Sequence, residues 1–98
     1  METFNDVISA DRLVLVDFYA IWCQPCKMMH PVMEQLKAEL GDKVRIIKVD
    51  VDKHGQTAAL YGIRSVPTFM LFRNGRTLWR QSGMMLKAAL LSVITSHL

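Results

Sequence analysis

The run from Leu13 to Tyr19, LVLVDFY, constrains the fold of this 98-residue chain more than any other stretch. It is rich in β-branched and aromatic residues and is apolar at both odd and even positions, the pattern of a strand that is covered on each face. Asp17 is the one anomaly within it. The run therefore predicts a central strand of a sheet with other layers packed on both sides.

A helix is expected from Gln24 onward, because the apolar residues then recur at intervals of three and four and Gly41 follows as a stop signal. Pro31 lies inside this helix, where a proline removes one hydrogen bond and clashes with the preceding turn, so we expect a bend there. The apolar positions of the helix are Met29, Val32, Met33, Leu36 and Leu40.

The remaining elements follow in an order that predicts a mixed sheet. A strand, a helix and a strand in succession favour a right-handed crossover with parallel pairing, and the Asn74-Gly75 pair suits a tight antiparallel hairpin. The expected elements are a strand at 44–49, a short helix at 56–61, hairpin strands at 68–72 and 77–81, and a helix at 85–98. The chain is thus predicted to be a single α/β domain over residues 1–98, with four strands between helices.

Composition and charge exclude several function classes. The formal charge of +3 comes from dispersed residues, which argues against a nucleic-acid interface. No apolar run approaches the roughly 20 residues needed to cross a bilayer, and the first residues lack the pattern of an export signal. We therefore expect a cytoplasmic protein that binds neither membrane nor nucleic acid.

The only two cysteines, Cys23 and Cys26, lie in the segment WCQPC between the expected strand and helix. Unsatisfied N–H groups and the helix dipole at a helix start favour a thiolate at Cys23. The spacing allows Cys26 to resolve a mixed disulfide formed by Cys23. Pro25 fits the first helical turn and stiffens this geometry, and Gln24 can add side-chain hydrogen bonds.

A zinc site is the alternative use of this spacing, since such sites commonly begin with two cysteines separated by two residues. Two further ligands are then required. His30 lies four residues after Cys26, whereas His54 and His97 are distant and follow no ligand pattern. No second Cys-x-x-Cys or His pair completes the set, and a redox-active dithiol without metal or organic cofactor is the preferred interpretation.

The segment VLVDFYAIWCQPCKMMHP resembles the active-site region of thioredoxins, and the resemblance continues in KVDVD (48–52), YGIRSVPTFMLFRNG (61–75) and the isolated Gly83. It covers nearly the whole chain from about Thr3. Tyr19 and Gln24 depart from the family's usual tryptophan and glycine. The first edge strand of the family fold is missing, which would place the strand at 44–49 on the sheet edge and lower the stability.

The resemblance implies a role for each site residue. Cys23 would attack a target disulfide and Cys26 would resolve the product, while Asp17 would accept the proton of Cys26, with Lys48 as its charge partner. Residues around the dithiol would contact the target through side chains and through backbone hydrogen bonds to an extended segment. These contact residues are Trp22, Gln24, Pro25, Val66, Pro67, Gly83 and Met84, with Pro67 in cis geometry.

Simpler structural roles exist for several of these residues. Trp22 could be an apolar anchor, and Lys48 could be an ordinary strand lysine. Gly83 could be a turn or bulge glycine, and His30 is expected to be a helix surface residue.

The predicted function is reduction of protein disulfides by a monomer that receives electrons from an NADPH-dependent thioredoxin reductase, by resemblance. Two alternatives stay open: a thiol oxidant or isomerase of the same fold, and a binding or scaffolding module.

Overall fold

Four strands form one sheet in the order β2-β1-β3-β4 in the computed structural model, which describes all 98 residues. The strands are β1 (Val14–Tyr19), β2 (Arg45–Asp50), β3 (Thr68–Arg73) and β4 (Arg76–Ser82). β1 pairs in parallel with β2 and antiparallel with β3, which pairs antiparallel with β4. The predicted mixed sheet with an interior first strand is confirmed.

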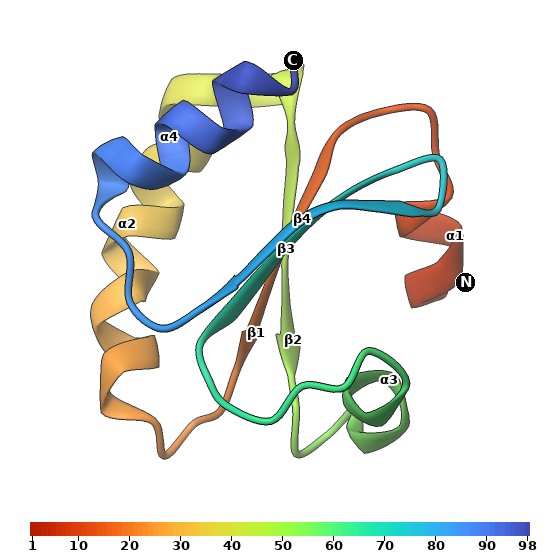
Figure 1. Cartoon of the computed structure of the whole chain (residues 1–98), viewed down its shortest axis with the longest axis vertical. Coiled ribbons are helices and arrows are strands. Elements are labelled where there is room, and N and C mark those ends of the chain that lie inside the picture. Colours follow the sequence, from red (N-terminus) through yellow and green to blue (C-terminus); the bar gives the residue numbers. More distant parts are fainter.

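Helices cover both faces of the sheet. Figure 1 shows α2 (Gln24–Leu40) and α4 (Lys87–Ser96) on one side and α1 (Phe4–Ile8) and α3 (Gly55–Leu60) on the other. A short 3-10 turn, η1 (Gly41–Lys43), follows α2. None of these helices combines the length and apolar character that a bilayer span requires. The predicted sandwich is therefore present, with element ends shifted by one or two residues from the expected ones.

Two apolar clusters pack on opposite faces of the sheet, because successive side chains of a strand point to opposite sides. Leu13 and Leu15 contribute to the cluster under α2, whereas Val14, Val16 and Phe18 contribute to the cluster on the face that carries α1. All five side chains are at most 1% exposed. Complete burial of such a side chain stabilises the fold by about 1.5–3 kcal/mol.

The ends of α2 have clear local causes. Cys23 is the N-cap residue, Pro25 lies in the first turn, and Gly41 ends the helix with a φ of 54°, a conformation that favours glycine. The helix continues without a break through Pro31, and the bend expected there stays a prediction.

The expected hairpin turn is also confirmed. Asn74 and Gly75 connect β3 to β4 and have φ values of 53° and 77°. Two successive residues with positive φ match the twist of an antiparallel hairpin.

β2 is an edge strand, as the sequence predicted, because it pairs only with β1. The backbone groups on its outer side have no strand partner. Glu2 forms a bidentate ion pair with Arg45 at the start of β2, with N···O distances of 2.7 and 2.8 Å. This contact ties the first residues of the chain to the edge strand.

Candidate active site

Cys23 and Cys26 form a disulfide at the start of α2, with 5.2 Å between their Cα atoms. The loop after β1 delivers Cys23 to the N-cap position, and Cys26 lies in the first turn of the helix. Cys26 is fully buried, whereas Cys23 keeps 3% of its surface exposed. Both residues are thus buried, and of the two only Cys23 keeps any surface in contact with solvent.

The N-cap position also provides electrostatic stabilisation for a sulfur anion. The backbone N–H of Cys26 donates a hydrogen bond to Cys23 Sγ over 3.2 Å. The helix dipole of α2 adds partial positive charge at the same point. Both interactions favour the thiolate of Cys23 over its thiol in the reduced state.

A loop that lies 43 positions further along the sequence packs beside the disulfide. Cys23 Sγ is 3.6 Å from the carbonyl oxygen of Val66, and the Val66–Pro67 peptide bond is cis. Gly83 N–H donates a 2.8 Å hydrogen bond to the carbonyl of Pro67, which brings the end of β4 to the same loop. Val66 thus lies against Cys23, and Gly83 is bonded to the next residue of the same loop, Pro67, whose expected cis geometry is confirmed.

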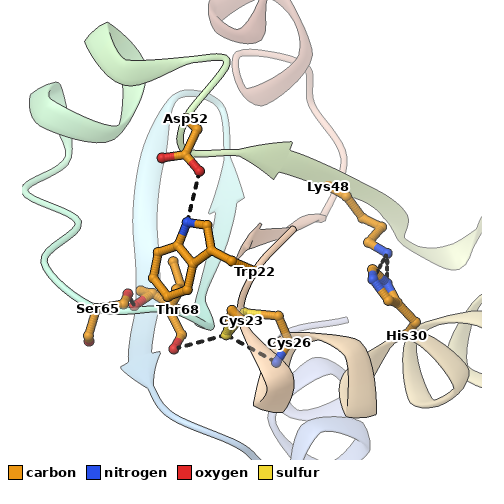
Figure 2. Close-up of a disulfide and its surroundings, with 9 residues drawn as sticks. Trp22, Cys23, Cys26, His30, Lys48, Asp52, Ser65 and Thr68 are labelled. Carbon is orange, nitrogen blue, oxygen red and sulfur yellow. Dashed lines mark hydrogen bonds between the residues drawn. A yellow bond between two sulfur atoms is a disulfide. The ribbon is translucent and has the colours of Figure 1, made fainter. Parts of the chain in front are cut away.

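Trp22 stands next to the disulfide with 70% of its surface exposed. Its indole N–H donates a 3.0 Å hydrogen bond to the carboxylate of Asp52, as Figure 2 shows. A hollow of about 130 Å³ lies beside the ring and is lined by Trp22, Val51, Ile63, Arg64, Ser65 and Val66. The ring is therefore held in one orientation while its apolar surface faces solvent.

Asp17 is completely buried, and neither of its carboxyl oxygens has a hydrogen-bond partner. Asp17 lies two residues after Leu15 and four after Leu13, so its side chain is on the same sheet face as theirs, the face that α2 covers. Burial raises the pKa of Asp17 from its ordinary value of 3.8 to about 6, and the positive charge of Lys48 opposes the shift. Such a carboxyl group can gain or lose a proton near neutral pH.

Lys48 lies directly opposite Asp17 on the neighbouring strand β2. Its ammonium group contacts the ring nitrogen Nδ1 of His30 on α2 and lies 5.1 Å from the centroid of the Tyr19 ring. Figure 2 shows the Lys48 and His30 side chains extending toward each other. Burial lowers the pKa of Lys48, and the Asp17 carboxylate opposes this shift.

The other predicted contact residues occupy the surface near the dithiol or its loop. Gln24 and Pro25 are exposed on the first turn of α2, and Met84 is 49% exposed directly after Gly83. No contact joins Met84 to the dithiol in the structure.

Three residues of the site were missed by the sequence reasoning. Asp52 lies in the segment KVDVD without a signal of its own, and its bond to Trp22 spans 30 positions of the sequence. His30 was read as a helix surface residue, but it is half-buried against Lys48. Thr68 holds the cis-proline loop through a 2.7 Å hydrogen bond to the carbonyl of Ser65. Contacts between distant segments leave no periodic signal in the sequence.

The zinc alternative lacks the side chains that it needs. No group of three or more His, Cys, Asp or Glu side chains is close enough together to hold a metal ion. His30 is engaged by Lys48 rather than directed at the cysteines.

A cysteine pair at a helix N-terminus, whose first sulfur accepts a backbone hydrogen bond, next to a cis-proline loop and a buried carboxyl group, defines a dithiol–disulfide oxidoreductase. Comparison with known proteins agrees with this class. The sequence model of the family described as Thioredoxin matches residues 1–96. The chain therefore belongs to the thioredoxin family.

Several known thioredoxins are similar to the chain over nearly its whole length. The thioredoxin of Chlamydia trachomatis is 46% identical over 96 residues, which cover 98% of this chain and 92% of that protein. The thioredoxin of Rickettsia typhi is 42% identical over 94 residues, 96% of this chain and 90% of that protein. The crystal structure of a Malassezia sympodialis thioredoxin, Mala s 13, superposes with a TM-score of 0.89 at 43% identity and covers 96% of this chain and 84% of its own.

These similarities confirm the predicted fold class and function. The chain is a thioredoxin-type protein disulfide reductase with Cys23 and Cys26 as its redox pair.

Proposed function

We propose that each turnover starts with attack of the Cys23 thiolate on a disulfide of a target protein. A bond forms between Cys23 Sγ and one target sulfur, and the other target sulfur leaves as a thiolate. The observation that supports this assignment is the position of Cys23 at the N-cap, where the Cys26 N–H points at its sulfur and part of its surface remains exposed.

Cys26 then resolves the mixed disulfide. Its thiol transfers a proton to the Asp17 carboxylate, through a water molecule, and the resulting thiolate displaces the second target sulfur from Cys23. The target gains two electrons, its two thiolates take up protons from solvent, and Asp17 releases its proton to solvent. The chain is left with the Cys23–Cys26 disulfide seen in the structure. A pKa of about 6 suits Asp17 to this step, since the group is mostly ionised at pH 7 and still basic enough to accept a proton.

The target is held by the surface around Cys23. The backbone of Val66 lies just before β3 begins and is available for hydrogen bonds to an extended target segment. Trp22 provides an apolar platform, and Pro67, Gly83, Met84, Gln24 and Pro25 complete the contact surface. The hollow beside Trp22 accommodates a small apolar side chain of the target.

The dithiol is regenerated by a reductase that draws on NADPH, which makes the chain a carrier of electrons to target disulfides. Membership of the thioredoxin family supports this direction of electron flow over the oxidant or isomerase alternative. A scaffolding role would not require Cys23, Cys26 and Asp17 together. We further propose that the chain acts as a monomer in the cytoplasm.

Reduction of insulin disulfides, with NADPH and thioredoxin reductase as the electron source, tests this function. The chain is expected to sustain turnover, while Cys23→Ser and Cys26→Ser abolish it. Asp17→Asn is expected to slow turnover by about two orders of magnitude. A well-folded chain that shows no turnover with the reductase or with a chemical dithiol would favour the scaffolding role.

A further inference from the structure

His30 contacts Lys48 but has no part in the reaction proposed above. It lies on α2, one turn beyond Cys26, and is half-buried. Lys48 Nζ contacts Nδ1 of the ring and lies 3.5 Å from Nε2. The imidazole also meets the Tyr19 ring edge-on, with 5.8 Å between the ring centroids. Lys48, His30 and Tyr19 therefore form a small cluster beside Asp17.

Lys48 has a choice of partners in this cluster. It lies in register with Asp17 across the parallel pair β1–β2, and both side chains are on the sheet face that α2 covers. The ion pairs of the structure nevertheless join Glu34 to Lys37, Glu2 to Arg45 and Glu39 to Lys87. The ammonium group thus contacts a ring nitrogen of His30 while a buried carboxyl group, without any partner, lies on the adjacent strand.

We propose that His30 is a positioning residue of the exchange reaction: it accepts the hydrogen bond of Lys48 and holds the ammonium group over Tyr19, away from direct pairing with Asp17. The inference rests on the proposed role of Asp17 as the proton acceptor for Cys26. A direct ion pair would favour the carboxylate and make it a weaker base. The contact with His30 therefore preserves the basicity that proton transfer from Cys26 requires.

The other groups around Asp17 do not provide the same control. Phe69 of β3 is its partner on the other side and carries no charge. Cys26 of α2 lies in the disulfide. Asp50, on the same face of β2, accepts hydrogen bonds from the N–H groups of Asp52 and Lys53. The positive charge of Lys48 opposes the raised pKa of Asp17, so its placement by His30 decides how strongly the carboxylate is favoured.

Two substitutions of similar size separate hydrogen bonding from simple packing. His30→Gln keeps an acceptor oxygen for Lys48, whereas His30→Leu keeps the volume and excludes water but offers no acceptor. The pKa of Asp17 is measured in the oxidised protein by NMR titration of its carboxyl carbon. His30→Leu is expected to lower this pKa by about one unit, because the freed ammonium can approach the carboxylate. His30→Gln is expected to leave it near the wild-type value.

The same pair is then compared in a Lys48→Met background, where no ammonium is present. There the proposal predicts that His30→Leu no longer changes the pKa of Asp17. An unchanged pKa in the single His30→Leu variant would overturn the proposal. A shift of the same size with and without Lys48 would also overturn it, because His30 would then act through packing alone.

Activity measurements distinguish failure of this inference from failure of the proposed function. The acid limb of the pH profile for insulin reduction is expected to move to lower pH in His30→Leu, in step with the NMR titration. If Asp17→Asn retained full activity, the proton-acceptor role would fail, and the NMR comparison would still report whether His30 controls Lys48.

Discussion

Asp17 and Lys48 face each other across the parallel strands β1 and β2, yet they form no ion pair. The carboxyl group is fully buried without a hydrogen-bond partner, and the ammonium group is bonded to His30. The Asp17 carboxylate is therefore destabilised by burial and only weakly compensated by charge. An arrangement of this kind reduces stability and supplies a base of suitable strength near the redox pair.

The first prediction concerns the pH dependence of stability. The pKa of Asp17 is about 6 in the folded chain against an ordinary 3.8, so the native state binds this proton more tightly than the unfolded state does. The contribution of Asp17 to stability is therefore present below pH 3.8 and is lost as pH rises through the window to about 6. The total loss is about 3 kcal/mol, from 1.36 kcal/mol per pKa unit.

Asp17→Asn removes this titration. Urea unfolding of the oxidised proteins should show the variant to be more stable than the wild type by about 2–3 kcal/mol at pH 7. The difference should shrink toward pH 4. Stability curves for the two proteins that run parallel between pH 4 and pH 7 would contradict the assignment of a raised pKa to Asp17.

The second prediction concerns which cysteine attacks. Both cysteines are buried, but Cys23 at the N-cap keeps 3% of its surface exposed against 0% for Cys26, so we expect Cys23 to form the mixed disulfide. Incubation of Cys26→Ser with an oxidised target should therefore accumulate a stable covalent complex, visible as a band that reducing agent removes. Cys23→Ser is the matched control and should trap nothing. Equal trapping by both variants would contradict the assignment of Cys23 as the attacking cysteine and Cys26 as the resolving one.

The third prediction concerns the hydrogen bond between Trp22 and Asp52. This bond fixes an indole that is otherwise mostly exposed, and its loss frees the ring to adopt other rotamers. Asp52→Ala should raise KM for a protein substrate about two- to fivefold, as expected for one hydrogen bond of roughly 0.5–1 kcal/mol. Asp52→Asn retains a carbonyl acceptor and should keep the wild-type KM. If Asp52→Ala changed only kcat, Asp52 would not act through substrate binding, and this prediction would be wrong.

The fourth prediction concerns the free edge of β2. Its outer backbone groups have no partner strand, so an appended strand that pairs with them should stabilise the fold. Each kcal/mol gained raises the melting temperature of a domain of this size by about 4–8 °C. An appended segment of the same length with prolines at alternate positions cannot pair and serves as the control. Identical melting temperatures for both extensions would show that the edge does not limit stability.

Much of the fold could be predicted from the sequence because local patterns carry it. The doubly apolar run at Leu13–Tyr19 indicated an interior strand, and the apolar periodicity after Gln24 indicated the long helix. The Asn74-Gly75 pair indicated the hairpin. In each case the pattern and its structural cause lie within a few residues, so these elements differ from the expected ones only at their ends, whereas no residue range was predicted for α1 or η1.

In the active site, too, the features with a local cause could be predicted and those that join distant segments could not. The positions of Cys23 and Cys26 follow from their spacing at a helix start, which is local. The bonds from Trp22 to Asp52 and from Lys48 to His30 join segments 30 and 18 positions apart, and only the folded chain brings them together. His30 shows most clearly what local patterns cannot predict, because its half-buried position against Lys48 depends on how α2 packs against β2.

The central claim is that the start of α2 holds Cys23 as a thiolate at neutral pH. The most direct test is the pH dependence of alkylation by iodoacetamide, measured on the reduced chain and on the same chain unfolded in urea. The account predicts that Cys23 titrates well below the value of about 8.5 for a free cysteine and is alkylated faster than Cys26 at pH 7. Two thiols that titrate alike and react no faster than in the unfolded chain would contradict it.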